Sequence, residues 1–363
     1  MDAHKRYTIS LVVLALAGMT ILLSASYYLQ PLSGDMTRIG GYAENDYGWN
    51  QPQKVFASGP FIHLTNYDQY ADVLVLGDSF SFGGLDGSVN MTWQRFFSHG
   101  TGLSVATINH YTKFEPTAEY GPDLLYKIVT SETFQKNPPR LFILEVIERQ
   151  LDILPIWEGN CQLGNKVENT LDIKHNPNPP ELVEVYRKTS PPSLSAQIGY
   201  ARKFLYGLIS KLWDKEQAVY QVEMTTPKLF SNQFSDQLLG YKDDFKILNW
   251  NDQYLANIRC NLLNAQNLVQ KNGKTLFIAM IVPDKLSAYS SHLKNKSYAN
   301  TSIIERLASD SSLNLVRIDP AVTKLINEGV VDVYLPNDMH WGYRGHEAAA
   351  TATVQYLATG SGK

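Results

Sequence analysis

Two widely separated segments contain the residue types of an acyl-transfer triad. Ser79 belongs to a Gly-Asp-Ser-Phe sequence at residues 77–80, and Asp338 and His340 belong to an Asp-Met-His-Trp sequence at residues 338–341. A serine hydroxyl is a weak nucleophile at neutral pH, so acyl transfer needs an imidazole to accept its proton and usually a carboxylate to orient that imidazole. The sequence therefore predicts Ser79 as nucleophile, His340 as base and Asp338 as orienting acid.

Ser79 follows a short apolar run that is typical of a buried strand. Residues 73–76 read Val-Leu-Val-Leu and lead into the Gly-Asp-Ser turn, so we expect a parallel strand with Ser79 at its carboxyl end. Open α/β sheets bind their ligands at that edge. Because Gly-Asp-Ser is a short sequence, an ordinary turn in which Asp78 or Ser79 caps the next helix is the alternative interpretation.

Asp338 and His340 are two residues apart, and in an extended turn this spacing puts both side chains on one side. The carboxylate can then accept one ring N–H while the other ring nitrogen meets the serine. The alternative is a turn-capping aspartate beside an unrelated surface or core histidine. Since the two halves stand at opposite ends of one α/β pattern, the sequence favours the joint interpretation.

His346 and Glu347 lie close to His340 in sequence and could be counted as metal ligands. They fall on a predicted terminal helix, and no cysteine or further histidine joins them, so we expect no metal site. We expect no bound cofactor either.

Apolar runs alternate with segments of helical periodicity along most of the chain. This alternation predicts an α/β fold, a three-layer α/β/α sandwich with a central parallel sheet covered on both faces. The predicted strands are residues 73–76, 103–108, 141–147, 275–282 and 315–318. One predicted helix begins near residue 93. The other predicted helices span residues 123–133, 251–270, 320–327 and 345–357.

The N-terminal region has the composition of a membrane span. Residues 7–29 carry no charge, which is long enough to cross about 30 Å of hydrocarbon as a helix. Lys5 and Arg6 precede this stretch and Asp35 follows it. This charge asymmetry favours an N-terminus inside the cytoplasmic membrane and the rest of the chain outside.

These observations divide the chain into three parts. We expect residues 1–30 to be a transmembrane anchor, residues 31–60 an irregular connector or a lead-in that packs on the domain, and residues 61–363 the catalytic domain. A proline- and asparagine-rich insertion at about 152–246 interrupts that domain, either as a substrate-facing rim or as a passive surface excursion. A signal peptide cleaved near the small residues 24–26 is the alternative to the anchor, and both interpretations export the protein.

Charge and cysteine content limit the partners and the compartment. The net charge of −3 offers no general attraction to nucleic acid, which we exclude as a partner. The 21 tyrosines, 14 phenylalanines and 6 tryptophans allow a weak carbohydrate hypothesis, although most of these rings belong in the core. Cys161 and Cys260 either pair in an oxidising compartment or remain separate buried thiols, and the sequence leaves both open.

On its Gly-Asp-Ser-Phe and Asp-Met-His-Trp segments, the chain resembles the SGNH or GDSL hydrolase superfamily over about residues 70–357, excluding the insertion. Within it, the chain looks most like the polysaccharide O-acetyltransferases related to the alginate and bacterial cellulose acetylation proteins. The order differs, because alginate-type transferases can carry Asp-x-His before the serine. The resemblance implies the roles of Ser79, His340 and Asp338 given above.

Superfamily esterases bind the oxyanion with a glycine in a second block and a Gly-x-Asn-Asp sequence in a third. The corresponding regions here read Asn-His-Tyr at residues 109–111 and Glu-Val-Ile-Glu-Arg at residues 145–149. We therefore expect other residues to replace these glycine and asparagine groups in oxyanion or substrate contacts, with the backbone N–H of Ser79 as a further donor. For Tyr111 and Arg149, core packing and a structural salt bridge are the alternatives. The replacement set is Asn109, Tyr111, Arg149 and Trp341.

The resemblance implies an exported, single-pass inner-membrane O-acetyltransferase with its catalytic domain in the periplasm. Its acceptor would be an exopolysaccharide, and its partner a membrane-bound O-acyltransferase that draws on cytoplasmic acetyl-CoA. Two alternatives remain at this point: an exported carbohydrate or lipid esterase, and a non-catalytic subunit for polysaccharide binding or assembly. An acyl-serine is common to the two enzymes, which differ in whether water or a sugar hydroxyl attacks it.

Overall fold

A six-stranded parallel sheet forms the centre of the fold. Its strand order is β10-β9-β5-β3-β4-β2, and every neighbouring pair is parallel. The strands are β2 (Ile62–Leu64), β3 (Val73–Gly77), β4 (Val105–Asn109), β5 (Leu141–Ile147), β9 (Leu276–Val282) and β10 (Leu315–Val316). The predicted α/β class with a central parallel sheet is therefore confirmed.

The computed structural model describes most of the chain. The described residues are 3–30, 32–57, 62–64, 67–83, 91–109, 122–154, 156–164, 167–168, 171, 173, 176, 178, 180–189, 193–212, 217–298, 303–309 and 311–359.

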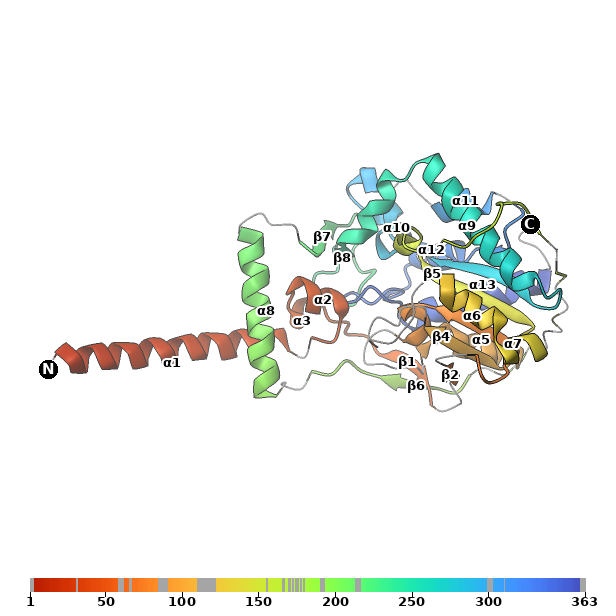
Figure 1. Cartoon of the computed structure of the whole chain (residues 1–363). Helices are drawn as coiled ribbons and strands as arrows, with labels where there is room; N and C mark the ends of the chain where they lie inside the picture. The colour runs from red at the N-terminus through yellow and green to blue at the C-terminus, as the bar shows by residue number, and fades with distance from the viewer. Residues whose placement is uncertain are drawn as a thin grey trace.

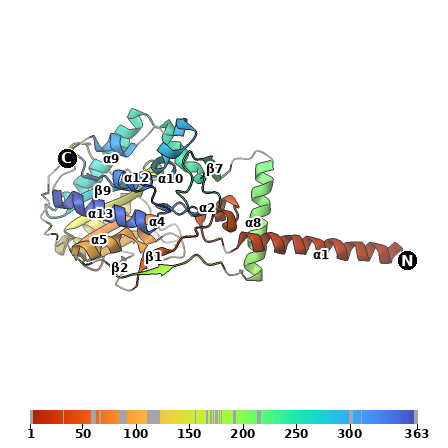
Figure 2. The ribbon, with the colours of Figure 1, turned by 180° about the vertical axis from the view of Figure 1, so that it is seen from behind.

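Helices cover both faces of this sheet (Figures 1 and 2). Every residue of β5 and β9 is buried, as expected for parallel strands enclosed on both sides. Alternate side chains of β3 enter two separate cores. One core includes α5 (Trp93–Thr101), α12 (Asp319–Asn327) and α13 (Tyr343–Thr359). The other includes α6 (Pro122–Thr130), α7 (Glu132–Lys136), α9 (Asp252–Gln270) and α11 (Ile303–Ala308).

The chain reverses its direction across the sheet beside β3. From β3 it crosses to β4 on one side, whereas from β5 it crosses to β9 on the other. The carboxyl ends of β3 and β5 therefore flank a topological switch point, where open α/β sheets leave a crevice for ligands. The Gly-Asp-Ser turn lies directly after β3.

The predicted insertion contributes no strand to the central sheet among the residues described. Its helix begins at Leu194, and the hydroxyl of Ser193, just before it, accepts from the Ala196 N–H at 3.4 Å. The elements of this region are β6 (Leu182–Val185), α8 (Leu194–Leu212), β7 (Val219–Glu223), β8 (Gln237–Tyr241) and the 3₁₀ helix η3 (Lys242–Asn249). Strand β6 pairs antiparallel with β1 (Gln53–Phe56), and β7 pairs antiparallel with β8.

Residues 32–57, the described part of the predicted connector, are more regular than the sequence suggests. They contain α2 (Asp35–Gly40), α3 (Glu44–Tyr47) and β1, and they pack on the domain, as one of the two sequence interpretations allowed. Met36, Tyr42 and Tyr47 form a small apolar cluster with β7 and β8. The remaining short helices are α4 (Ser79–Phe82), η2 (Glu148–Gln150), α10 (Lys285–Ala288), η4 (Ser290–His292) and η5 (Lys296–Tyr298).

The first helix, α1 (Ala3–Leu29), projects away from the domain (Figures 1 and 2). Its most apolar window has a mean hydropathy of 2.2, and none of that window is buried. Among the described helices, α1 alone is long and apolar enough to span a membrane.

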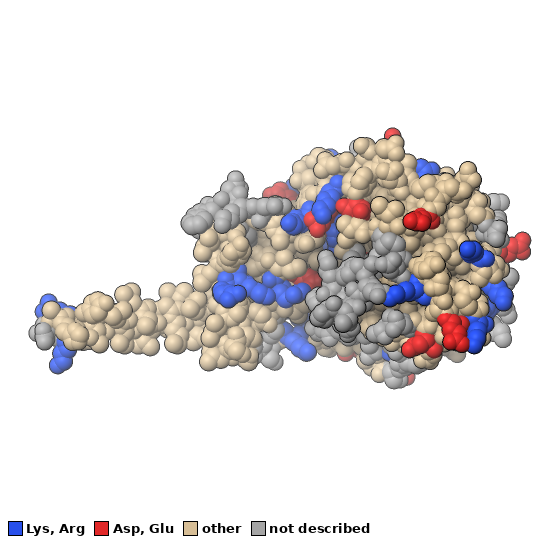
Figure 3. Space-filling model, in the orientation of Figure 1, with Lys and Arg blue, Asp and Glu red and all other residues tan. Residues whose placement is uncertain are grey.

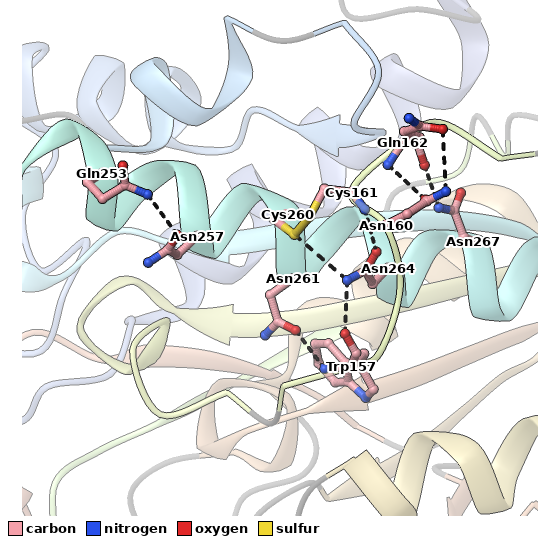
Figure 4. Close-up of a disulfide and its surroundings, with 10 residues drawn as sticks. All are labelled: Trp157, Asn160, Cys161, Gln162, Gln253, Asn257, Cys260, Asn261, Asn264 and Asn267. Carbon is pink, nitrogen blue, oxygen red and sulfur yellow. Dashed lines mark hydrogen bonds between the residues drawn. A yellow bond between two sulfur atoms is a disulfide. The ribbon is translucent and has the colours of Figure 1, made fainter.

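Cys161 and Cys260 form a disulfide that joins the start of the insertion to α9 (Figure 4). Asn264, one turn further along α9, reinforces the junction. Its amide oxygen accepts from the Cys161 N–H at 3.2 Å, and its amide nitrogen donates to the Trp157 carbonyl at 2.9 Å. Of the two states that the sequence left open, the structure contains the paired one, which is typical of proteins outside the reducing cytosol.

Candidate active site

Asp78 fixes the turn that presents Ser79. One carboxylate oxygen of Asp78 accepts from the Phe80 N–H at 2.9 Å and caps α4, while the other accepts from the Ile147 N–H at 2.9 Å, at the end of β5. The capping role foreseen for Asp78 is therefore present, and it does not compete with a role for Ser79. Asp78 and Phe80 are buried, whereas Ser79 is exposed at the carboxyl end of the sheet.

A buried carboxyl group supports the same turn from below. Glu145 Oε2 accepts from the Asp78 N–H at 3.0 Å and from the Ser81 hydroxyl at 2.6 Å. A side chain at Gly77 would have no space, because a Cβ there would lie 2.4 Å from Ser81 Oγ and 2.7 Å from Glu145 Oε2. Burial, and then the charge of Asp78, raise the pKa of Glu145 and favour its neutral form.

The three residues predicted from the two distant segments come together in the order that acyl transfer requires. His340 Nε2 lies 2.6 Å from Ser79 Oγ, and His340 Nδ1 lies 2.5 Å from Asp338 Oδ1. His340 and Asp338 are buried, while Ser79 is exposed. With Nδ1–H donating to Asp338, Nε2 is free to accept the serine proton.

Asp338 has a second layer of contacts that the sequence did not reveal. Its Oδ1 also accepts from the His340 backbone N–H at 2.9 Å, and its Oδ2 accepts from the Asp35 backbone N–H at 2.8 Å. The Asp35 carboxylate lies 3.7 Å from His340 Nδ1. The first turn of α2 therefore completes the environment of the candidate orienting acid.

These contacts shift the ionisation of the pair in opposite directions. Burial would raise the pKa of Asp338, but the charge of His340 and the hydrogen bonds from His340 and the Asp35 N–H outweigh it, so the pKa is lowered. Burial would lower the pKa of His340, but Asp338 and then the charges of Asp35 and Asp78 raise it above its ordinary value. Asp338 is thereby kept ionised and His340 is made a stronger base.

Lys285 holds the loop that carries Asp338 and His340. Its ammonium donates to the carbonyl oxygens of Leu335 at 2.8 Å, Pro336 at 3.0 Å and Asp338 at 3.1 Å. Burial lowers the pKa of Lys285 to about 7, although Asp338 and other acids oppose this shift. An antiparallel bridge between Tyr334 and Trp341 closes the same loop.

Arg149 supports that loop from another direction. Its guanidinium is buried and forms ion pairs with Asp284 and, at 3.2 Å, with Asp244. Its Nη2 lies 2.9 Å from the sulfur of Met339, the residue between Asp338 and His340. These contacts match the salt-bridge alternative rather than the predicted oxyanion role.

Trp341 is also placed differently from the prediction. It is 0 % exposed, with its ring centroid 4.9 Å from that of Phe80, so it lies in the core and cannot contact substrate. The ring of Phe80 also lies 4.8 Å from the ring of His340. Phe80 thus packs against the imidazole, and Trp341 packs against Phe80.

Asn109 keeps a position compatible with its predicted role. It is the last residue of β4 and is in register with Gly77, two positions before Ser79. Its side chain therefore starts from the same edge of the sheet as the candidate nucleophile. Tyr111, the other predicted contact, lies outside the described residues.

Within the described part of the chain, Asp35, Asp338 and His340 form a group that could hold a cation, with ligand atoms within 4.8 Å of one another. Within this group, His340 Nδ1 and Asp338 Oδ1 are 2.5 Å apart, as in a hydrogen bond between the ring N–H and the carboxylate. His346 and Glu347 are not members of it. Burial lowers the pKa of His346 to about 3, and Glu347 pairs with Arg344 at 2.7 Å.

Sequence reasoning missed Asp35 and Lys285. In the sequence, Asp35 is notable only as a charge that follows the predicted membrane span, and Lys285 follows a predicted strand without any motif around it. For Lys285, the only signal in the sequence was a lysine that closely follows a predicted buried strand.

No protein-family model matches the chain, and no curated protein or solved structure matches it either.

Proposed function

We propose that this protein is a membrane-anchored O-acetyltransferase with an SGNH-type three-layer α/β/α domain, and that it carries the acetyl group on Ser79. One observation supports the proposal most strongly. The hydroxyl of Ser79, the two ring nitrogens of His340 and the carboxylate of Asp338 form a continuous chain of contacts at 2.6 and 2.5 Å. That chain is the arrangement of a serine nucleophile with its base and orienting acid.

In the first half-reaction, Ser79 Oγ attacks the donor's acyl carbonyl as its proton passes to His340 Nε2. The bond between the acyl carbon and the donor's leaving group then breaks, and the leaving group takes the proton from Nε2, which leaves an acetyl ester on Ser79. Asp338 and the nearby charge of Asp35 stabilise the transient imidazolium.

In the second half-reaction, an acceptor hydroxyl loses its proton to His340 Nε2 and attacks the acetyl ester. The ester bond to Ser79 breaks, and Oγ recovers the proton. We assign oxyanion donation to the Ser79 backbone N–H and Asn109, with Tyr111 as a further member of that set. Arg149 and Trp341 have no part in this assignment, because their contacts lie inside the protein.

The predicted membrane anchor is the reason why we favour a transferase over an esterase. Only residues 30–34 separate α1 from Asp35, whose backbone N–H contacts Asp338. If α1 spans the inner membrane, the triad is tied to its periplasmic surface. There, a membrane-bound O-acyltransferase partner could deliver acetyl groups derived from cytoplasmic acetyl-CoA to an exopolysaccharide acceptor. No resident cofactor is required.

The test uses the full chain in phospholipid nanodiscs with an activated acetyl ester, in the presence and absence of short polysaccharide fragments. We expect acetylated fragments, and we expect Ser79→Ala to reduce their formation by about ten-thousandfold or more. Ser309→Ala, at an exposed helix end, is the matched control and should retain activity.

The products distinguish the alternatives. Free acetate formed through Ser79 at a rate that no fragment changes would indicate an esterase, which the exposure of Ser79 to water would permit. Equal turnover by Ser79→Ala and the parent protein would contradict both enzymatic functions.

A further inference from the structure

Helix α8 lies across the end of α1 that is nearer the domain (Figures 1 and 2). The two helices touch at Ser26, which is buried and whose hydroxyl lies 3.5 Å from Gln197 Oε1. Leu29, the last residue of α1, is also buried. The exposed apolar part of α1 therefore ends where α8 crosses it.

One side of α8 is packed closely against the domain through glycines. A Cβ at Gly207 would lie 3.2 Å from the Gly40 carbonyl, and a Cβ at Gly41 would lie 3.2 Å from the Lys203 carbonyl. Gly41 has a φ of 67°, which favours glycine. The two backbones approach closely, so α8 is held in a fixed orientation on α2.

The side of α8 that faces away from the domain is apolar. At about 100° per residue, four apolar positions fall within an arc of about 60°, roughly opposite Gly207. Their side chains are between 37 and 63 % exposed. The four residues are Leu194, Ile198, Leu205 and Ile209, which we call the apolar face of α8.

The charges and tyrosines around this face are those of a membrane–water boundary. Residues 194–212 include no acidic residue, and the side chains of Arg202 and Lys203 are exposed. Figure 3 shows basic side chains where α1 joins the folded domain. Tyr27, Tyr28 and Tyr206 are also exposed at this level, where tyrosines form interfacial belts.

We propose that α8 is a membrane-interface helix whose apolar face lies in the outer layer of the same phospholipid bilayer that α1 spans. Its position across the end of α1 and its basic flank favour an anionic lipid surface over other occupants. The inference rests on the proposed anchor and not on acyl transfer. Attachment through two helices would fix the orientation of α2, and with it the Asp35 contact to Asp338, at the membrane surface.

The experiment measures contact with lipid directly. The full chain carries a fluorescent label on Ile198→Cys or Leu205→Cys, in nanodiscs of phosphatidylethanolamine and phosphatidylglycerol that contain spin-labelled lipid quenchers near the headgroups. Ile156→Cys is the matched control, because Ile156 is 80 % exposed and lies beside α9, away from α8. Interfacial insertion to about 5–10 Å predicts quenching at α8 about threefold stronger than at the control.

A label on Leu16→Cys, in the middle of α1, separates the anchor from the new proposal. It is measured with lipids that carry the spin label deep in the acyl chains, because the middle of a spanning helix lies at the centre of a hydrocarbon core about 30 Å thick. Quenching there without quenching at α8 would leave the anchor intact and overturn the interfacial role of α8. Protection of the α8 labels only after a second copy or another membrane protein is added would assign this face to that protein instead, and would also overturn the proposal. Absence of quenching at Ile198, Leu205 and Leu16 would overturn both the anchor and the interface helix.

Discussion

The two halves of the candidate triad are supported in different ways. The serine half is part of the central sheet: Asp78 bonds to the end of β5, and buried Glu145 accepts from the turn below Ser79. The histidine half lies on a loop that is held from outside the sheet, by the ammonium of Lys285 and the backbone N–H of Asp35. The nucleophile is thus placed by the fold's core, whereas the base is placed by long-range contacts.

Because of this difference, we expect substitutions in the serine half to affect the stability of the fold and substitutions in the histidine half to affect activity. Changes to the serine half disturb buried strands, but changes to the histidine half can alter the acid–base pair while the sheet stays intact. Because α2 contacts both Asp338 and α8, the histidine half is also the one connected to the membrane-proximal region. The following substitutions test this division in order of decreasing expected effect.

Asp338→Asn should cause the largest loss after that of the nucleophile. An amide cannot stabilise the imidazolium and favours the wrong tautomer of His340, so we expect kcat for acetyl transfer to fall by about ten-thousandfold. Asp252→Asn, at a surface ion pair, is the matched control. Retention of more than about a tenth of the activity by Asp338→Asn would contradict the assigned role.

Lys285→Met should have an intermediate effect on catalysis. The substitution leaves three carbonyl groups without their ammonium donor, at a cost of about 1–3 kcal/mol for each buried group left unsatisfied. We expect a lower melting temperature and a kcat reduced about tenfold with little change in KM, because a positioning residue acts through His340. Lys324→Met, on the surface of α12, controls for loss of charge.

If Lys285→Met lowered the melting temperature but left kcat at the parental value, the loop would not depend on this lysine for its catalytic geometry. The statement that long-range contacts place the histidine half would then be wrong for Lys285.

Asp35→Asn should have the smallest effect at neutral pH and a distinct pH signature. Burial lowers the pKa of His340, whereas Asp338 and then Asp35 raise it to a net value above the ordinary 6.5. A base must be neutral, so activity should fall as the pH drops through this pKa. Loss of the Asp35 charge lowers the pKa and should move the acid limb of the kcat/KM profile to lower pH.

The Asp35 N–H remains in Asp35→Asn, so the hydrogen bond to Asp338 is retained. The substitution removes the carboxylate charge beside His340 and with it the ion pair between Asp35 and Arg38. Asp243→Asn, at a surface ion pair, should leave the profile unchanged. An acid limb that stayed in place or moved to higher pH in Asp35→Asn would contradict the electrostatic account.

Sequence patterns predicted the parts of the fold that local rules determine. The sequence predicts a strand at residues 141–147, the observed bounds of β5, because six of these seven residues are apolar, as in a strand buried on both faces. The sequence also predicts that Ser79, His340 and Asp338 lie together, because the chemistry of acyl transfer restricts the residue types, and the structure brings these three side chains into contact. Strand β2, with three residues at the sheet edge, is too short for a periodic signal.

The errors have physical reasons. Asp35 and Asp338 are 303 positions apart and meet through a backbone N–H, which leaves no trace in residue type. Trp341 belongs to the set predicted for oxyanion or substrate contacts. The alternation that puts Asp338 and His340 on one side, however, directs position 341 to the other side and into the core.

The central claim is that Ser79 forms an acyl-enzyme through His340. The most direct measurement is intact-protein and peptide mass analysis of the full chain in nanodiscs, quenched with acid shortly after mixing with the activated acetyl ester. We predict one added acetyl group on the peptide that contains Ser79, absent from Ser79→Ala and strongly reduced in His340→Ala. Acetylation located elsewhere, or unchanged in both variants, would contradict the account.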